Sequence, residues 1–380
     1  MERIRGLDTI RGACMFIMIF GHMVDWWLRP EDYWLRSWLY AFLESLIVGF
    51  LFISGVSAAL AFKNNEMKLQ VQKNFNMKFI RNVYFLRAFI ILLIGFAYNF
   101  FVAVLWGGDI TDLWSWLVLQ TIGFSLLLTW PFLRRSRNFR IFLGIFILIV
   151  NQLILSLLMG GPYKDLSNIY GIVYHILYNP ITQFPILPYF SIILIGTALG
   201  DKIFEINIKG DQNERKLLFK DKLIKPLFLI GAVLLLFGLI FFYPELLILP
   251  EVYFSNPNIV MNTISSFAYS MGIILMALAL FMAIQIFEII KTKKSYRYLF
   301  FYSYYSFTIY LGHNLLYFLF PEQLTCVTIW IGVIGGGILF GFLFRAMYLK
   351  LGVKASLKSG IGALSFILAT KLNKNKNERL

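Results

Sequence analysis

Long apolar runs constrain this chain more than any other feature of its sequence. A helix needs about 20 mainly apolar residues to cross the hydrocarbon core of a bilayer, because it rises about 1.5 Å per residue. We predict a membrane-spanning helix in each such run: 9–28, 38–62, 88–106, 113–133, 141–159, 183–204, 226–249, 263–290, 298–320 and 325–349. The sequence therefore predicts an all-α, polytopic membrane helical bundle of about ten transmembrane helices.

The composition agrees with a membrane protein and excludes the common soluble classes. Hydrophobic residues make up 59% of the 380 and charged residues 14%, whereas about a quarter of the residues in a soluble domain are charged. The longest polar stretches, 63–87, 201–225 and the C-terminal tail, are too short to form a domain. We expect a single transmembrane domain over 1–349. The basic cytoplasmic tail over 350–380 is either amphipathic, with a short helix near 361–372, or disordered.

Positive charge alternates between the two sides of the predicted bundle. The formal net charge is +15, and nearly all Lys and Arg fall in the two termini and in every second connection. Basic loops mark the cytoplasmic side, so we predict a multi-pass protein of the cell membrane with both termini cytoplasmic. The basic excess then reflects orientation and contact with anionic membrane lipids. We find no signal for nucleic acid beyond it.

The two cysteines give no sign of a disulfide framework or a metal centre. Cys14 and Cys326 both lie within apolar runs, far apart in the sequence. Zinc sites and disulfide frameworks need several cysteines or histidines at characteristic spacings. We therefore expect no metal.

Polar residues inside a membrane are costly unless they are paired or face a cavity, so they are candidates for function. The first predicted helix has most of them, and six of its residues fall within an arc of about 100° on a helical wheel: Asp8, Arg11, Met15, Met18, His22 and Asp25. Either this stripe is a functional line facing the bundle interior, or Asp8 and Arg11 form an i,i+3 pair while His22 and Asp25 emerge at the far end.

Two other predicted helices carry further candidates. Glu44 lies in the second one, where it either takes part in proton transfer or locks this helix to the first by hydrogen bonds. The ninth helix, 298–320, brings four polar residues to one face of the wheel: Tyr302, Ser306, His313 and Tyr317. His313 is either functional or a satisfied packing residue.

Five sequence blocks, spread over most of the chain, carry a family resemblance. They are Arg5–His22 with LDTIRG, Glu44–Gly55 with FLFISG, Leu119–Gly123 with LQTIG, Phe184–Gly200 with FPILPY, and Tyr310–His313 with YLGH. Together they resemble the integral-membrane acyltransferase superfamily, in particular heparan-alpha-glucosaminide N-acetyltransferase and its prokaryotic relatives, with the catalytic membrane domain only. The chain differs from the human-type enzymes in having no histidine between His22 and His175.

That resemblance implies transfer of an acyl group, most simply acetyl, from cytosolic acetyl-CoA to a hydroxyl or amine of a glycan or envelope acceptor at the extracytoplasmic face. His22 would be the general base, with Glu44 or Asp25 orienting it or taking the proton. The resemblance also implies a set of residues that bind CoA or the acceptor: Asp8, Arg11, Arg81, Gln120, Tyr310 and His313.

A second class of function competes with this one. In a proton-coupled transporter or flippase for a small solute or lipid-linked sugar, Asp8, Arg11, His22 and Glu44 would relay protons, and CoA would not be needed. The oligomeric state is also open, because the glycine-rich tenth helix can serve either a homodimer or its own bundle.

Overall fold

A computed structural model gives the fold. It describes residues 4–71, 76–106, 113–159, 161–162, 165–179, 184–209, 211–241, 263–289 and 296–377. Several side chains within these ranges fall outside the description: those of 37–38, 40–47, 71, 105–106, 159, 296–297 and 374–377.

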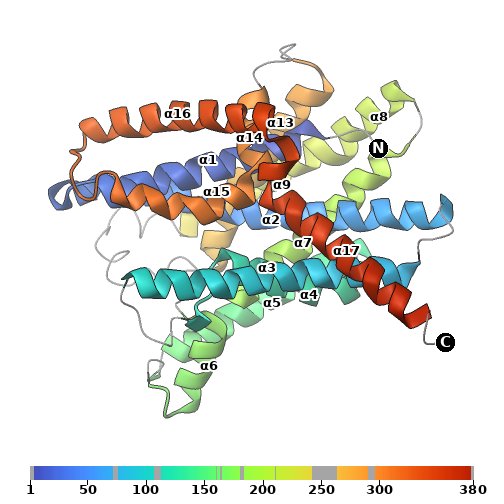
Figure 1. Ribbon diagram of the computed structural model, residues 1–380, viewed down its shortest axis with the longest axis horizontal. Coiled ribbons are helices and arrows are strands. Elements are labelled where there is room, and N and C mark those ends of the chain that lie inside the picture. Colours follow the sequence, from blue (N-terminus) through green and yellow to red (C-terminus); the bar gives the residue numbers. More distant parts are fainter. Residues whose placement is uncertain are drawn as a thin grey trace. The chain divides into compact units, whose positions relative to one another are not determined.

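The regular structure of the described residues is helical (Figure 1). The α-helices are α1 (Arg5–Trp27), α2 (Tyr33–Val71), α3 (Met77–Trp106), α4 (Val118–Thr129), α5 (Arg137–Met159), α6 (Ile169–Tyr178), α7 (Ile186–Asn207), α8 (Gln212–Phe219), α9 (Lys225–Phe241), α13 (Ile264–Ile286), α14 (Tyr296–Tyr304), α15 (Ser306–Gly312), α16 (Thr328–Lys350) and α17 (Leu357–Asn377). Short 3-10 turns are η1 (Pro30–Asp32), η3 (Trp130–Phe132), η5 (His313–Phe318) and η6 (Gly352–Ala355), and the π-helical turn η4 (Lys220–Ile224) joins α8 to α9.

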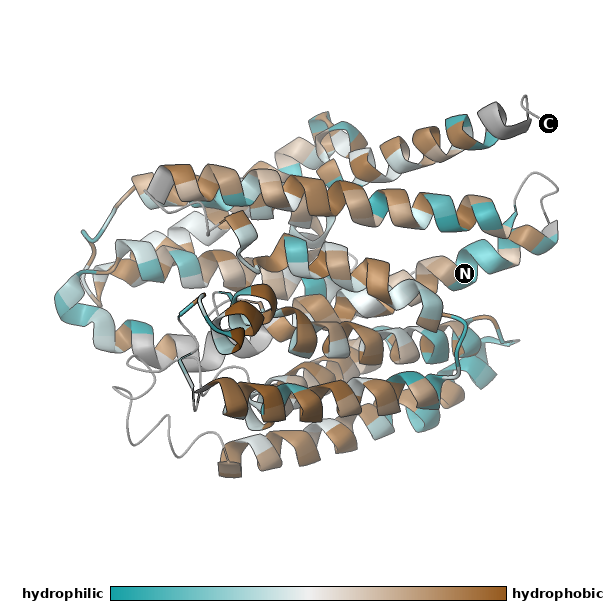
Figure 2. Ribbon diagram, turned by 90° about the horizontal axis from the view of Figure 1, so that it is seen from below, coloured by the Kyte–Doolittle hydropathy of each residue, from teal (hydrophilic) through white to brown (hydrophobic). Residues whose placement is uncertain are grey.

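Seven of the described helices are long and apolar enough to cross a membrane. They coincide with seven of the predicted spans: α1, α3, α5, α7, the run from α8 to α9, α13 and α16. Figure 2 shows these helices hydrophobic along most of their length, with hydrophilic residues toward their ends. The chain is therefore a multi-pass membrane protein. The count of ten and the side on which the termini lie stay predictions.

The three remaining predicted spans differ from the simple helix that hydropathy suggested. The run 38–62 lies within α2, which is 39 residues long. The run 113–133 contains only the 12-residue α4, followed by η3. The third, 298–320, is divided into several elements. Outside the predicted spans, the tail segment 361–372 lies within α17.

The predicted helix over 298–320 does not continue as one helix. It is divided into α14, α15 and η5, with Tyr305 between the first two at φ −95° and ψ 15°. Tertiary hydrogen bonds accompany this break, because the hydroxyl of Tyr305 donates to the carbonyl of Gly352 at 2.9 Å and that of Thr308 to the carbonyl of Ala355 at 3.1 Å. The face that a continuous helix would have shared between Tyr302 and His313 therefore does not exist. Tyr302 instead donates to the carbonyl of Gly337 on α16.

The chain divides into two compact units. The first comprises 1–50, 206–260 and 265–360, and the second comprises 51–205, 261–264 and 361–380. In the first unit, Gly337 and Gly341 of α16 receive the aromatic rings of Phe16 and Tyr298. These glycines therefore serve contacts within their own bundle.

In the second unit, glycines let α2 and α7 approach each other at backbone distance. A Cβ added at Gly55 would collide with the carbonyl oxygen of Ile193, and one at Gly196 or Gly200 with a carbonyl of α2. The sequence block around Gly55 and the GxxxG of α7 thus meet in one tight helix crossing. Small residues allow this approach in a membrane, where close van der Waals contact drives helix association.

We expect Gly55→Ala to destabilise the protein by about 1–3 kcal/mol, because the new methyl group overlaps a backbone atom that cannot move aside without shifting a helix. Gly335→Ala on α16 is the matched control, since nothing lies within 4 Å of the Cβ that it would add. Thermal unfolding of the purified protein in detergent compares the two. Equal melting temperatures for both variants would contradict the tight crossing.

Candidate functional site

The C-terminal half of α1 holds the centre of the candidate site. Gly12 lies directly against the backbone carbonyl of Leu299, which allows α1 to run closely along α14. The same helix contacts α15, η5 and α16. Its residues His22, Asp25 and Trp26 thereby come next to the chain segment that follows α15.

Two histidines that are far apart in the sequence meet here. The ring centroids of His22 and His313 are 4.8 Å apart. Trp26 stacks on both, at 4.9 Å from His22 and 5.8 Å from His313. The ring centroids of Tyr310 and His313 are 5.4 Å apart, and Tyr317 meets Trp26 edge-on. We call His22, Trp26, Tyr310, His313 and Tyr317 the histidine cluster.

The two imidazoles differ in their hydrogen bonding. The Nδ1 of His313 contacts the carbonyl oxygen of Tyr310. A carbonyl can only accept a hydrogen bond, so Nδ1 carries the proton and donates it. In the neutral ring this leaves Nε2 unprotonated. The Nδ1 of His22 is buried and has no hydrogen-bond partner among the described residues. The hydrogen-bonding capacity of this nitrogen is therefore unused within the described part of the chain.

A charged pair lies one turn beyond His22. The Nε of Arg36 on α2 is 2.6 Å from a carboxylate oxygen of Asp25, and both side chains are partly buried. Sequence reasoning identified Asp25 but missed Arg36. The sequence does contain one indication of Arg36, because it is one of few basic residues on the predicted outer side of the membrane.

Backbone hydrogen bonds hold this end of α1 against the chain after η5. Leu324 donates to the carbonyl of Trp27 at 2.7 Å, and Glu322 donates to that of Trp26 at 2.9 Å. The indole of Trp27 donates to the carbonyl of Leu316 at 2.7 Å, within η5. These bonds fix α1 and η5 relative to each other, and with them the two histidines.

The other predicted residues of α1 lie near its beginning. Asp8 and Arg11 form an ion pair, with a nitrogen and an oxygen 3.8 Å apart, and Arg11 is buried. Eleven residues separate Arg11 from His22, which corresponds to about 16 Å along a helix. The side chain of Glu44 lies outside the described part of the chain.

Comparison with known families decides the family. Residues 3–243 match the model of the family described as "Heparan-alpha-glucosaminide N-acetyltransferase, catalytic". The chain belongs to this family. The comparison with curated proteins gave no match.

The match covers only part of the histidine cluster. His22, Asp25, Arg36 and the second unit up to Glu205 lie within the matched residues, whereas His313 and Tyr310 lie beyond them. The family is one of membrane acetyltransferases. His22 lies in the part of the chain that matches the family's catalytic domain. Among the described residues, no group of three or more His, Cys, Asp and Glu side chains is placed to hold a metal ion.

Two residues that the sequence predicts to bind CoA or the acceptor, Arg81 and Gln120, belong to the second unit. Arg81 is exposed on α3. Gln120 of α4 is buried and lines the same small cavity as Phe96, Trp114 and Phe124, and neither of its amide atoms has a hydrogen-bond partner among the described residues.

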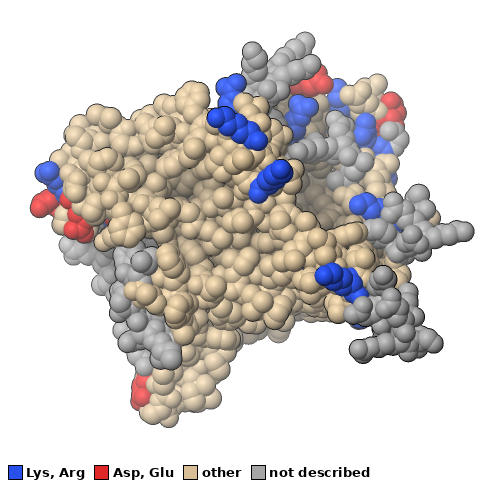
Figure 3. All heavy atoms as spheres, viewed as in Figure 1, with Lys and Arg blue, Asp and Glu red and all other residues tan. Residues whose placement is uncertain are grey.

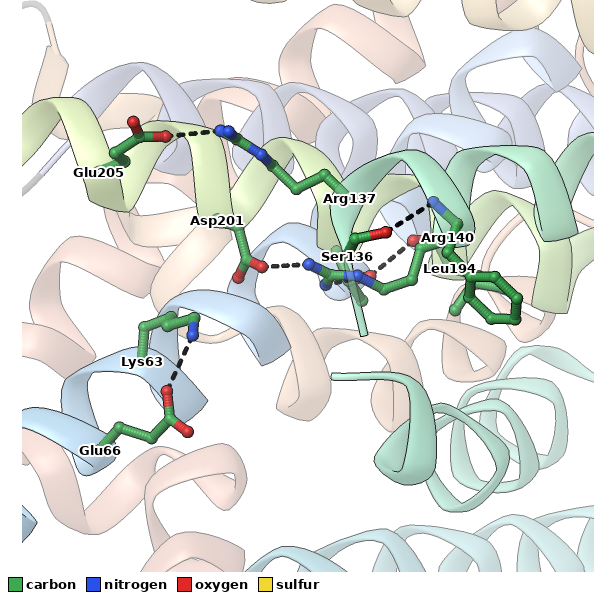
Figure 4. Close-up of polar contacts among 10 residues, drawn as sticks. Lys63, Glu66, Ser136, Arg137, Arg140, Leu194, Asp201 and Glu205 are labelled. Carbon is green, nitrogen blue, oxygen red and sulfur yellow. Dashed lines mark hydrogen bonds and ion pairs between the residues drawn. The ribbon is translucent and has the colours of Figure 1, made fainter. Parts of the chain in front are cut away.

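Sequence reasoning missed a buried ion pair in the second unit. Arg140 on α5 is fully buried and pairs with Asp201 on α7, and its second nitrogen donates to the hydroxyl of Thr197 at 2.9 Å. Figure 4 shows the guanidinium aimed at Asp201, with Arg137 and Glu205 forming a neighbouring pair at 2.6 Å. In the sequence, Arg140 falls in the connection before the predicted span 141–159, among other basic residues. Its position in the first turn of the apolar helix α5 is the feature that could have indicated a buried charge.

Proposed function

We propose that this protein transfers an acetyl group from cytosolic acetyl-CoA to a hydroxyl or amine of a glycan or envelope acceptor at the extracytoplasmic face of the cell membrane. The proposal includes cytoplasmic termini, for which the one-sided basic loops are the support. The observation that carries the proposal is the histidine cluster, in which His22 of the family's catalytic domain lies 4.8 Å from His313, centroid to centroid.

In this proposal His22 is the general base. The buried Nδ1 of His22 takes the proton from the acceptor hydroxyl or amine, and the freed lone pair of the acceptor attacks the carbonyl carbon of the acetyl group. The carbon–sulfur bond then breaks and the sulfur leaves with its electron pair. The thioester of acetyl-CoA already activates the acetyl group, so no residue of the chain needs to activate it.

The neighbours of His22 have supporting roles. His313, held through Tyr310, presents its unprotonated Nε2 as a hydrogen-bond acceptor for the hydroxyl or amine of the acceptor. Trp26 holds the plane of the His22 ring by stacking on it. Asp25, fixed by Arg36, places a negative charge one turn from the imidazole, where it stabilises the imidazolium formed when the proton is taken.

Arg11 is the residue that we assign to donor binding at the opposite end of α1. A guanidinium forms charge-assisted hydrogen bonds with phosphate oxygens, and the pairing of Arg11 with Asp8 fixes its position. The helix length between Arg11 and His22 is on the scale of a pantetheine arm.

We expect Arg11→Gln to weaken acetyl-CoA binding by about ten- to a hundredfold, because it removes a charge-assisted contact worth about 1.5–3 kcal/mol. His22→Ala is the comparison and is expected to keep the affinity of the wild type. Titration calorimetry of the detergent-purified protein measures both. Loss of binding in His22→Ala with normal binding in Arg11→Gln would reverse the assignment of the two ends of α1.

A further inference from the structure

The last described helix, α17, belongs to the second unit from Ile361 onward and buries one face there. Ile361, Ser365 and Ala369 of α17 follow one another at four-residue spacing and are buried. The ring of Phe366 meets Phe79 of α3 edge-on, with centroids 5.3 Å apart. Figure 1 shows α17 crossing α3 obliquely. This contact holds α17 in place, and side chains on the opposite side of the helix are exposed within the described part of the chain.

That opposite side changes character along the helix. Leu364 and Ile367 are 46% and 51% exposed. Lys371 follows on the same side, four residues after Ile367 and seven after Leu364. Lys374 and Lys376 continue the sequence. An exposed helix side that is aliphatic first and then basic is typical of helices that lie at a membrane interface.

The sequence around α17 is strongly basic. No acidic residue occurs between Glu322 and Glu378, although this stretch holds many lysines. On the face of the molecule that α17 crosses, Figure 3 shows separate Lys and Arg side chains on an otherwise uncharged surface, with acidic side chains only at the margins. A surface of this kind is complementary to negatively charged head groups above acyl chains, and each near-surface lysine contributes about 1 kcal/mol to such binding.

We propose that α17 is a binding surface for anionic phospholipid. Leu364 and Ile367 enter the boundary of the acyl chains, and Lys371 contacts the phosphate groups. The proposal rests on α17 alone and is independent of acetyl transfer.

Fluorescence quenching in nanodiscs tests this surface. In full-length protein with Cys14→Ala and Cys326→Ser, a bimane probe is attached at Ile367→Cys, and the lipids carry brominated acyl chains that quench it on contact. We expect quenching at least about twofold stronger in discs that contain phosphatidylglycerol than in pure phosphatidylcholine, because the head-group charge draws the helix in. High salt should remove the difference, since it screens surface charge.

Two matched variants complete the test. A probe at Ile149→Cys, about equally exposed on the membrane-length helix α5, should be quenched alike in both kinds of disc. Replacing the three lysines from Lys371 to Lys376 by glutamine should reduce quenching of the Ile367 probe in the anionic discs to its level in phosphatidylcholine. Equal quenching of that probe in both discs, strong or absent, would overturn the proposal, as would insensitivity to the lysine substitutions.

Discussion

Replacing His22 by alanine is expected to lower kcat for acetyl transfer by about a hundred- to ten-thousandfold, the usual contribution of a general base. The reason is that the buried Nδ1 of His22 has no hydrogen-bond partner among the described residues, so it can take a proton from the acceptor. The rate of CoA release in the presence of an amino sugar measures the loss. Because alanine leaves a space the size of the ring, added imidazole should restore part of the activity.

The three histidines of the chain supply the controls. His175 lies in α6, within the second unit, and His175→Ala should keep the activity of the wild type. His313→Ala is expected to lower kcat less than His22→Ala does. If His22→Ala stays folded and fully active, or if imidazole rescues only the His313 variant, His22 is not the base.

Asp201→Ala is expected to destabilise the protein by about 3–5 kcal/mol, because it leaves the fully buried guanidinium of Arg140 without its counter-charge. The exposed pair nearby gives a matched comparison. Arg137 and Glu205 are 38% and 45% exposed, so Glu205→Ala should cost at most about 1 kcal/mol. Reversible unfolding in mixed detergent micelles measures both.

A double variant separates the charge from the fold. Replacing Arg140 and Asp201 together by leucine removes both buried charges, and such replacements are often neutral or stabilising. We therefore expect the double variant to be more stable than Asp201→Ala alone. Similar losses from Asp201→Ala and Glu205→Ala would show that Arg140 does not depend on its partner.

Hydropathy predicted the fold well where a helix is a simple apolar cylinder. It failed between Tyr296 and Phe318, because no proline marks the break at Tyr305. That break coincides with hydrogen bonds to η6, a segment almost 50 residues later in the chain. Periodicity cannot foresee a tertiary contact of this kind, so the predicted common face of Tyr302 and His313 was not found.

The candidate site was predictable in its residues and not in its contacts. A polar stripe on an apolar helix singled out His22 and Asp25, and a lone intramembrane histidine singled out His313. Their meeting depends on the approach of α1 to η5, which rests on backbone hydrogen bonds such as that from Leu324 to Trp27. Arg36 escaped notice because only the folded chain shows that it reaches Asp25.

The most direct measurement of the central claim is acetyl transfer across a sealed membrane. Proteoliposomes that enclose glucosamine, with the protein's basic loops facing outward, receive labelled acetyl-CoA in the external buffer. Transfer through the protein predicts label on the enclosed glucosamine, lost in His22→Ala and unaffected by a proton ionophore. Absence of label on the enclosed sugar with a folded protein, or label only on sugar added outside, would contradict it.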